Sequence, residues 1–314
     1  MITVRAPEGV GEIRAGDDIA AVLLDVLGGS LEDGDIVVVT SKVVSKAEGR
    51  TRVSTRDAEL PGQTTRVVAR REPTTIVRNL LGLTMAAAGI DASNVAAGTV
   101  LLLPEDPDAT ARRIRAALRE RTGANVGVVV TDTAGRAWRD GQTDLAIGAA
   151  GLVVLESYAG RTDAHGNPLV VTAPAVADEI ASAAELAQGK LGGRPFAVVG
   201  GRGDLVLPPG EDGPGASSLV RPEGADLFGY GAREAVVRAL AGRPEDRAPF
   251  GAPATAEELS EAVLAVTGVT PQGDGDGLVV AGGDAAALRA LAFAFGWTVT
   301  HDSDGLSRLC PPTP

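Results

Sequence analysis

The residues of this sequence that could do chemistry lie in short polar segments that follow runs of valine. The segment "TDTAGRAWRD", residues 131–140, comes directly after "NVGVVV" and begins with two hydroxyls and an aspartate. A buried strand over residues 126–130 would place Asp132 and Thr133 at its carboxyl end, where ligands commonly sit in sheets covered on both faces. The alternative is that Asp132 or Thr133 caps the following turn, with Gly135 turning the chain.

The lysines form a second group of chemical interest. Of 29 basic residues only three are lysines, and two of them, Lys42 and Lys46, fall within "TSKVVSKAEG". The compact ammonium of lysine is a common point-charge partner for phosphate, whereas arginine binds as a planar fork. The alternative is a chance cluster on a solvated loop. Arg50, a few residues later, is interpreted as part of such a loop, so Arg50→Lys is expected to change little.

Oxygen donors suited to a hard divalent cation occur in distant segments. Asp91 and Asn94 lie in "GIDASN", and Asp132 follows the valine run. Magnesium and manganese prefer oxygen ligands from one or two carboxylates together with phosphate oxygens. A site shared by Asp91 and Asp132 is therefore a hypothesis about the fold. Asp106 and Asp108 are a rival pair, although entry into a helix also explains them.

Composition argues against several other classes of protein. The net charge of −12 argues against a nucleic-acid partner or an anionic membrane surface, and no apolar run approaches the ~20 residues that span a bilayer. Two histidines and one cysteine give little support to a His/Cys metal cluster or a Cys–His pair. There is neither a Walker A loop nor a GxSxG nucleophile elbow. The single Cys310 and the lack of a signal-peptide pattern predict a cytoplasmic protein.

The polar segments must be positioned by buried strands that alternate with helices, a pattern that predicts a mixed α/β (α+β) protein. Helices are expected over "GDDIAAVLLDVLGG", "APAVADEIASAAELAQGK" and "DATARRIRAALRERTG", the last capped by Asp108 or Thr110. The segment "DIVVVTSKVVSK" is predicted to be one buried strand, and "TTRVVARRE" has helix-like spacing. Residues 242–253 have the composition of a linker, and a small α/β unit follows them.

Several segments together closely resemble the coenzyme F420-0:L-glutamate ligases, the F420 gamma-glutamyl ligase family. They occur in the family's order between residues 2 and 242, and they are "DGDIVVVTSKVVSKAEGR", "LTMAAAGIDASNV", "LLLPEDPDATARRIR", "VVVTDTAGRAWRDGQTDLAIGAAGL", "AVADEIASAAELAQGK" and "RPEGADLF". The resemblance is greatest to the actinobacterial branch, in which the ligase is the N-terminal half of a two-domain protein. It implies the family's fold with mixed sheets, a ligase domain over residues 1–245, and an extension over residues 246–314 that is too short for those relatives' nitroreductase domain.

The resemblance implies a GTP- and metal-dependent ligase that works as an intertwined homodimer. Such an enzyme activates a carboxylate of the deazaflavin precursor F420-0 as an acyl phosphate, joins L-glutamate to it, and adds further glutamates through γ-links. Manganese or magnesium, up to two ions per site, would be the cofactor, with potassium as a further candidate. The alternative functions are a non-catalytic F420- or nucleotide-binding relative and a metal-dependent phosphohydrolase.

Carried over by motif, the resemblance gives roles to particular residues. Asp91 and Asp132 would hold the first metal and Thr133 would contact the second, with Lys46 and Asp132 as the catalytic residues. The nucleotide contacts would be Val10, Gly11, Glu12, Ile13, Ser41, Lys46, Asn94, Gln188, Gly189 and Lys190. Two features depart from the family. Lys190 stands where archaeal relatives have an acidic residue for the second metal, and "VGEI", residues 10–13, lacks the usual proline, which leaves the preference for guanine over adenine open.

Overall fold

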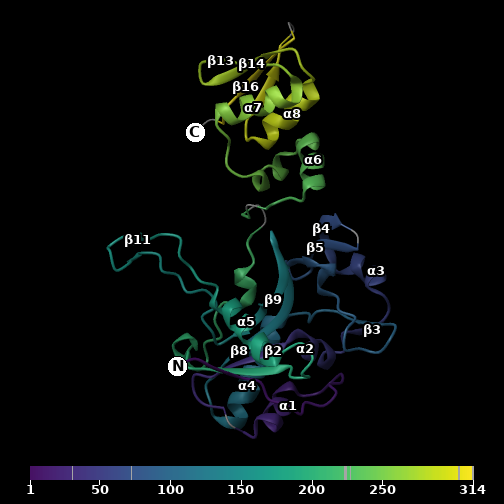
Figure 1. Cartoon of the computed structure of the whole chain (residues 1–314), viewed down its shortest axis with the longest axis vertical. Coiled ribbons are helices and arrows are strands. Elements are labelled where there is room, and N and C mark those ends of the chain that lie inside the picture. The colour runs from purple at the N-terminus through teal and green to yellow at the C-terminus, as the bar shows by residue number, and fades with distance from the viewer. Residues whose placement is uncertain (30, 72, 223–224, 227, 303–304, 313–314) are drawn as a thin grey trace. The chain divides into compact units, whose positions relative to one another are not determined.

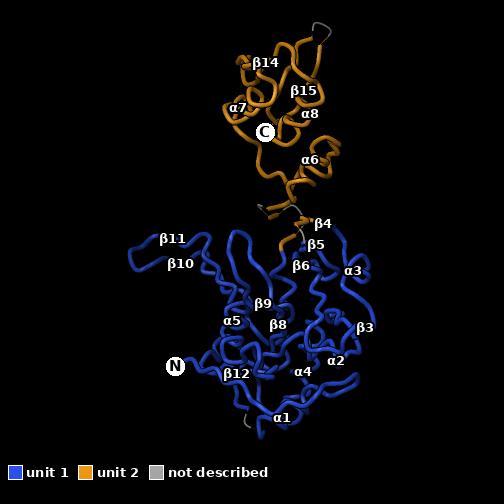
Figure 2. The backbone as a smooth tube through the Cα atoms, turned by 45° about the vertical axis from the view of Figure 1, so that its right-hand side comes forward, with its two compact units in different colours: residues 1–67, 72–220 blue, residues 68–71, 221–314 orange. Residues whose placement is uncertain are grey.

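The computed structural model describes residues 1–29, 31–71, 73–222, 225–226, 228–302 and 305–312. The chain divides into two compact units, one formed by residues 1–67 with 72–220 and the other by residues 68–71 with 221–314 (Figure 2). The "RPEGADLF" motif lies partly outside the described residues, at positions 223, 224 and 227. Within the described ranges, no helix has the length and apolar character needed to cross a membrane.

A five-stranded mixed sheet forms the centre of the first unit (Figure 1). Its strands, in spatial order, are β1 (Thr3–Arg5), β12 (Phe196–Gly200), β2 (Ile36–Thr40), β8 (Gly127–Arg136) and β9 (Arg139–Ala150). Strands β2 and β8 run parallel, and the other neighbouring strands run antiparallel. The valine runs of β2 and β8 are buried on both faces, which places these strands in the interior of the sheet. The prediction of a mixed α/β protein is therefore confirmed.

Helices cover both faces of this sheet. They are α1 (Ile19–Leu27), α4 (Pro107–Thr122) and α5 (Val176–Gln188). Side chains alternate along β2, so that Val37 and Val39 pack with α1 and α4, whereas Ile36 and Val38 pack with α5. Each face therefore has its own hydrophobic core, and together the two cores hold the strands that carry the candidate site.

Smaller sheets and short helices surround this centre. The sheets are β3 (Thr51–Val53) with β7 (Thr99–Leu101), β4 (Thr64–Arg71) with β5 (Thr74–Asn79) and β6 (Thr84–Ala86), and β10 (Arg161–Thr162) with β11 (Pro168–Leu169). The short helices are α2 (Ser41–Ala47), α3 (Arg56–Glu59) and the 3-10 helices η1 (Leu60–Gln63), η2 (Ala87–Gly89), η3 (Gly203–Leu205) and η4 (Ala216–Leu219). Helix α2 follows β2 directly, and this junction forms one side of the candidate site.

Two predicted elements differ from the structure. The helix-like interpretation of "TTRVVARRE" is wrong, because residues 64–71 form strand β4, in which β-branched threonines and valines favour an extended chain. The strand predicted through "DIVVVTSKVVSK" ends at Thr40, and α2 begins at Ser41 because the apolar residues that follow have helical spacing. Lys42 and Lys46 therefore lie on a short helix and not on the strand.

The predicted cap of α4 is also wrong. Asp106, and neither Asp108 nor Thr110, caps this helix by accepting a hydrogen bond from a first-turn amide. The Asp108 carboxylate is buried and accepts hydrogen bonds from backbone amides in β9 and η4. The fold thus accounts for both carboxylates, which leaves the rival metal pair without support.

The C-terminal unit has an antiparallel sheet and a hydrophobic core of its own. Its strands, in spatial order, are β13 (Gln272–Asp274), β14 (Gly277–Ala281), β16 (Leu306–Cys310) and β15 (Thr298–His301); its helices are α6 (Ala232–Ala241), α7 (Ala256–Thr267), α8 (Ala285–Ala294) and the 3-10 helices η5 (Pro244–Asp246) and η6 (Ala248–Phe250). Leu259 and Leu288 are fully buried in its core. The small α/β unit is therefore confirmed. The functional boundary between residues 245 and 246 stays a prediction, whereas the compact unit begins at residue 221, because α6 packs against α8.

Candidate functional site

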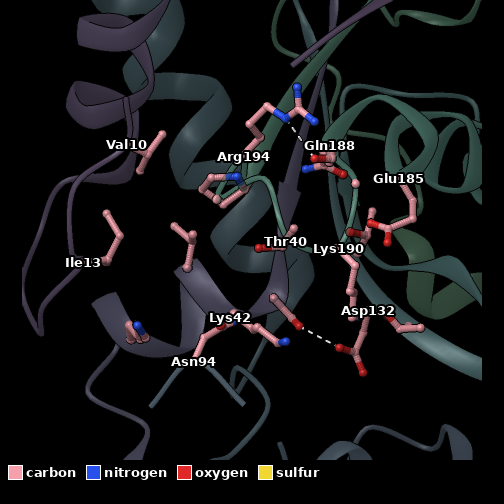
Figure 3. Close-up of a pocket in the computed structure, with 18 of the residues that line it drawn as sticks. Val10, Ile13, Thr40, Lys42, Asn94, Asp132, Glu185, Gln188, Lys190 and Arg194 are labelled. Atoms are coloured by element: carbon pink, nitrogen blue, oxygen red, sulfur yellow. Dashed lines mark hydrogen bonds between the residues drawn. The ribbon is translucent and has the colours of Figure 1, made fainter. Parts of the chain in front are cut away.

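A cavity of about 830 Å³ opens where the parallel pair β2–β8 ends (Figure 3). Its walls come from the loop after β1, the start of α2, residues 94–96, neighbouring parts of β8 and β9, and the end of α5 with the turn that follows. The predicted site residues that line it are Val10, Gly11, Glu12, Ile13, Ser41, Lys46, Asn94, Asp132, Thr133, Gln188, Gly189 and Lys190. Asp91 is not a lining residue, but it is joined to the wall through Lys42.

The junction of β2 with α2 explains why a hydroxyl and a carboxylate meet here. The last pair of residues across the two parallel strands is Thr40 with Thr131. Beyond this pair the chain of β2 turns into α2, whereas β8 continues as a hairpin with β9. Ser41 Oγ donates a hydrogen bond to Asp132 Oδ1 at 2.8 Å. Asp132 therefore lies within β8 beside the carboxyl end of β2, a usual place for ligands, and it is not a turn cap.

Asp132 occupies an unfavourable position for an isolated negative charge. Burial raises the pKa of its carboxyl to about 7, and the carboxylates of Asp144 and Asp91 add to this shift. Hydrogen bonds from the Ser41 hydroxyl and the Thr133 amide act in the opposite direction. A cation bound beside Asp132 would keep the carboxyl ionised at neutral pH, and without one the group exchanges a proton near neutrality.

The two candidate metal ligands on β8 lie on opposite faces of the sheet. Because side chains alternate along a strand, Asp132 shares a face with Val130, and Thr133 shares the other face with Thr131. Thr133 Oγ1 donates to Asp144 Oδ1 at 2.7 Å, and Thr131 Oγ1 donates to Asp144 Oδ2 at 3.2 Å. Asp132 and Thr133 therefore face two different parts of the cavity. Asp144 lies beside Thr133.

Lys42 connects the cavity to Asp91. Its Nζ lies 2.6 Å from Asp91 Oδ2 and donates to Ser93 Oγ at 2.7 Å. The Ser93 amide donates to Asp91 Oδ1 at 2.8 Å. Burial acts to raise the pKa of Asp91, but the hydrogen bonds from Lys42 and Ser93 outweigh burial and hold the pKa below its ordinary value. Asp91 is therefore ionised at neutral pH and pairs with an ammonium group.

Lys46 pairs with Glu12 of the N-terminal loop, with 2.6 Å between Nζ and Oε1. The Lys46 side chain is 14% exposed, whereas that of Glu12 is 69% exposed. An ion pair with so exposed a carboxylate contributes little to stability. A phosphate group that enters the cavity can therefore replace Glu12 as the partner of Lys46.

The last turn of α5 supplies the opposite wall. Glu185 and Gln188 are three residues apart and so lie on the same side of the helix. Burial raises the pKa of Glu185, the charge of Asp144 adds to the rise, and Lys190 opposes it. Gln188 is 1% exposed, and its Oε1 and Nε2 have no hydrogen-bond partner in the part of the chain that the structure describes. This wall therefore holds a carboxyl and an unsatisfied amide.

The predicted oxygen donors are of the kind that binds a hard divalent cation. Asp91 and Asp132 are hard carboxylate ligands, and phosphate oxygens of a bound nucleotide would complete the coordination. Among the residues described, no group of three or more His, Cys, Asp or Glu side chains could hold a metal, so the ion would have to be shared with a ligand. At the predicted second-metal position, Lys190 Nζ lies 3.5 Å from the Thr133 hydroxyl, and that hydroxyl donates to Asp144 Oδ1; whether a second ion binds there stays a prediction.

Several cavity residues were not among the predicted site residues: Thr40, Asp144, Glu185 and Arg194. Asp144 could have been predicted from the sequence, because "TDTAGRAWRDGQTD" has the pattern of a hairpin. The register of that hairpin places Asp144 opposite Thr133. Helical spacing from Gln188 contains a signal for Glu185. Arg194 has no such signal, because only the fold brings its Nε within 3.0 Å of the Gln188 carbonyl oxygen.

Carboxylates, hydroxyls and ammonium groups that converge on a cavity at the ends of parallel strands define an α/β protein with an enzyme-like small-molecule site. The family described as F420-0:Gamma-glutamyl ligase matches residues 9–201, a range that contains every residue lining the cavity. The chain belongs to this family of ligases.

Similar proteins named coenzyme F420:L-glutamate ligase cover most of the same region. The protein from Archaeoglobus fulgidus is 40% identical over 214 residues, which span 62% of this chain and 85% of that relative. The protein from Methanopyrus kandleri is 36% identical over 241 residues, spanning 69% of this chain and 93% of the relative. The protein from Methanothermobacter thermautotrophicus is 34% identical over 253 residues, spanning 72% and 98%.

Proposed function

We propose that this protein joins L-glutamate to coenzyme F420-0 through an amide bond and then extends the product by γ-linked glutamates. GTP transfers its γ-phosphoryl group to the acceptor carboxylate and leaves as GDP. The amine of glutamate then attacks the acyl carbon of the resulting acyl phosphate, inorganic phosphate leaves, and the nitrogen loses a proton to give the amide. The observation that carries this proposal is the meeting of Ser41, Lys46 and Asp132 at one cavity, within the region that matches the ligase family.

The wall formed by α2 suits the phosphates of the nucleotide. Lys42 and Lys46 are four residues apart on one helix and present two ammonium groups to the cavity. Ammonium groups act as point charges toward phosphate oxygens, and the amide of Asn94 adds a hydrogen-bond donor on the same side. Residues 10–13 form the adjacent loop and would contact the rest of the nucleotide.

A magnesium or manganese ion held by Asp91 and Asp132 would offset the negative charge that develops as the phosphoryl group moves. The chain's own groups have distinct tasks around the reaction. The Ser41 hydroxyl orients the Asp132 carboxylate through their hydrogen bond. Lys46 leaves the exposed Glu12, contacts a phosphate and fixes its position before transfer.

The direct test is an assay of glutamylation. Incubation with F420-0, L-glutamate, GTP and manganese should give products that mass spectrometry separates by successive glutamyl units, with GDP formed in step. Asp132→Asn should abolish the products. Glu179→Gln, a matched carboxylate-to-amide change on an exposed position of α5, should not. A lack of product with every nucleotide and metal tried would contradict the proposal.

The same experiment separates the alternative functions. Tight nucleotide binding without release of GDP would indicate a non-catalytic binder, and GDP release that does not depend on glutamate would indicate a phosphohydrolase. Substitution of ATP for GTP measures the base preference that the "VGEI" loop leaves open. The homodimer also stays a prediction, which light scattering of the purified protein tests.

A further inference from the structure

The turn between α5 and β12 carries two of the predicted nucleotide contacts, Gly189 and Lys190, but it has little structure of its own. Within the described chain, no backbone amide or carbonyl of residues 190–193 forms a hydrogen bond. Leu191 is 98% exposed and packs in neither core. A turn of this kind loses conformational entropy when it is ordered on a ligand, unless other groups already hold it. The order of this turn therefore depends on side chains that bond to it from outside.

The guanidinium of Arg194 lies inside this turn. Arg194 Nε donates a hydrogen bond to the Gln188 carbonyl oxygen at 3.0 Å (Figure 3). A Cβ atom at Gly192 would lie 2.7 Å from Arg194 Nε and 2.9 Å from its Nη2, and a Cβ atom at Gly189 would lie 3.5 Å from Nη2. The turn therefore wraps around the guanidinium, and the glycine at position 192 leaves room for it.

The two residues that this hydrogen bond joins stand on fixed parts of the fold. Gln188 is the last residue of α5. Arg194 precedes Pro195, whose carbonyl oxygen accepts from the Thr40 amide at the end of β2 at 3.0 Å. A residue before proline is also restricted to an extended backbone. The Arg194 side chain therefore joins the end of the helix to the start of β12 and closes the turn between them.

The same guanidinium contacts the N-terminal loop on the other side of the cavity entrance. Arg194 Nη1 lies 3.4 Å from Glu8 Oε1, and Glu8 stands two positions before residues 10–13, which line the cavity. The Glu8 side chain is 79% exposed, so this ion pair contributes little by itself. Arg194 thus contacts both segments that carry predicted nucleotide contacts, and its bond to Gln188 is the stronger of the two.

We propose that Arg194 is a positioning residue that preorganises the turn over residues 189–193 for the nucleotide. The planar guanidinium has several donors and reaches Gln188 and Glu8 together, which a single ammonium group does not. The proposal rests on the proposed function, in which a nucleoside triphosphate binds in this cavity. It adds a residue that sets the affinity for the nucleotide and leaves the affinity for the amino acid unchanged.

Replacement of the guanidinium tests this role. Arg194→Met keeps the length of the side chain without its donors, and it should raise the Kd of a fluorescent GTP analogue with magnesium about tenfold. The KM for GTP should rise with it, whereas kcat and the KM for L-glutamate should stay within about twofold. Arg194→Lys should not restore the affinity, and Glu8→Gln should change it less than about twofold. Arg119→Met, at an exposed position of α4, is the control.

A glycine substitution tests the same contact from the other side. The backbone φ at Gly192 is not positive, so alanine fits the chain there, but its Cβ would displace the guanidinium. Gly192→Ala should therefore raise the Kd of the GTP analogue nearly as much as Arg194→Met. In Arg194→Ala protein, where this space is empty, the same change should add less than about twofold. Gly62→Ala, at an exposed position with no atom close to the added Cβ, should have no effect. Additive losses at positions 192 and 194 would contradict the proposal.

Proteolysis measures the order of the turn without any nucleotide. Trypsin cleaves after Lys190, and this cleavage should be faster in Arg194→Met and Gly192→Ala than in the wild type, while the melting temperatures stay close to the wild-type value. If these variants change cleavage and Kd but the wild type forms no glutamylated product, the ligase function fails and the role of Arg194 stands. Glutamylation by Arg194→Met with a wild-type Kd for the GTP analogue would overturn the role of Arg194 and leave the function. Equal rises of KM for GTP and for L-glutamate would show a general loss of structure and would also overturn it.

Discussion

Ser41 and Asp132 lie 91 positions apart in the chain, yet Ser41 Oγ is 2.8 Å from Asp132 Oδ1. The contact exists because β2 and β8 run parallel and their pairing ends together at Thr40 and Thr131. The hydroxyl favours the ionised form of a carboxyl whose pKa burial raises to about 7. The acidity of Asp132 therefore depends on a strand–helix junction that is distant in the sequence.

Replacement of Ser41 by alanine should move the pH dependence of the reaction. Without the hydroxyl the charged form of Asp132 loses a hydrogen bond, so its pKa rises further above the ordinary value. At a fixed manganese concentration, the acidic limb of kcat/KM plotted against pH should move upward by about one unit. Ser157→Ala, at an exposed position outside the cavity, is the control and should leave the profile in place. If Ser41→Ala left the acidic limb of the kcat/KM profile unchanged, the Ser41 hydroxyl would not control the pKa of Asp132 in the reaction.

Asp132→Asn should stabilise the ligand-free protein above neutral pH while it abolishes activity. The ordinary pKa of this carboxyl is 3.8 and its folded-state pKa is about 7, so the unfolded chain ionises first and the free energy of unfolding falls as pH rises between these values. Asparagine removes this effect. Thermal melts should coincide with the wild type near pH 4 and show a gain of roughly 1–3 kcal/mol above pH 7. A melting temperature lower than that of the wild type at pH 8 would contradict the assignment.

Lys46 should not tolerate arginine. If its ammonium contacts a phosphate as a point charge, the broad guanidinium displaces that charge, and a lost charge-assisted hydrogen bond costs about 1.5–3 kcal/mol. We expect Lys46→Arg to lower kcat/KM for GTP roughly tenfold or more and Lys46→Ala roughly a hundredfold, with both variants folded by circular dichroism. Turnover by Lys46→Arg at the wild-type rate would contradict the claim that the reaction needs the compact ammonium group of a lysine at this position.

The structure shows that Arg50 is not a suitable control position for the Lys46 variants. Arg50 was expected on a solvated loop, but its side chain is 14% exposed, its Nε donates to the Leu103 carbonyl oxygen at 3.0 Å, and its Nη1 pairs with Glu105. Arg50→Lys is therefore not expected to be silent. Arg52 is exposed, and its Nη1 donates to neighbouring carbonyl oxygens. Arg52→Lys is the better control and should keep both activity and stability.

The two compact units should unfold separately. Each has its own core, with Leu259 and Leu288 at the centre of the C-terminal one. If the proposed nucleotide site is correct, a GTP analogue with magnesium should bind the folded first unit and raise the transition of that unit alone, by about 2.7 kcal/mol when the free ligand is a hundred times its Kd. Differential scanning calorimetry should show two transitions. Leu259→Ala should lower the melting temperature of the C-terminal unit alone. A single transition that both changes move together would show that the units unfold as one.

The sequence by itself determined the parts of this protein that depend on local pattern. Buried valine runs predicted the inner strands, and the periodic segment that became α5 predicted a helix, because both patterns repeat within a few residues. The predicted site residues, apart from Asp91, all line one cavity; the sequence could supply them as candidates since each family motif is contiguous. The same local reasoning failed at "TTRVVARRE", where a helix-like spacing competes with the β preference of threonine and valine.

The tertiary structure alone decided how these residues act on one another. The parallel register of β2 and β8 brings Ser41 to Asp132, and the bridge from Lys42 to Asp91 crosses between distant segments. Burial, which sets the pKa of Asp132 and leaves the Gln188 amide without partners, is a property of everything packed around a side chain. A sequence motif specifies which groups are present, but their charges and free hydrogen bonds follow from three-dimensional neighbours that no short segment contains.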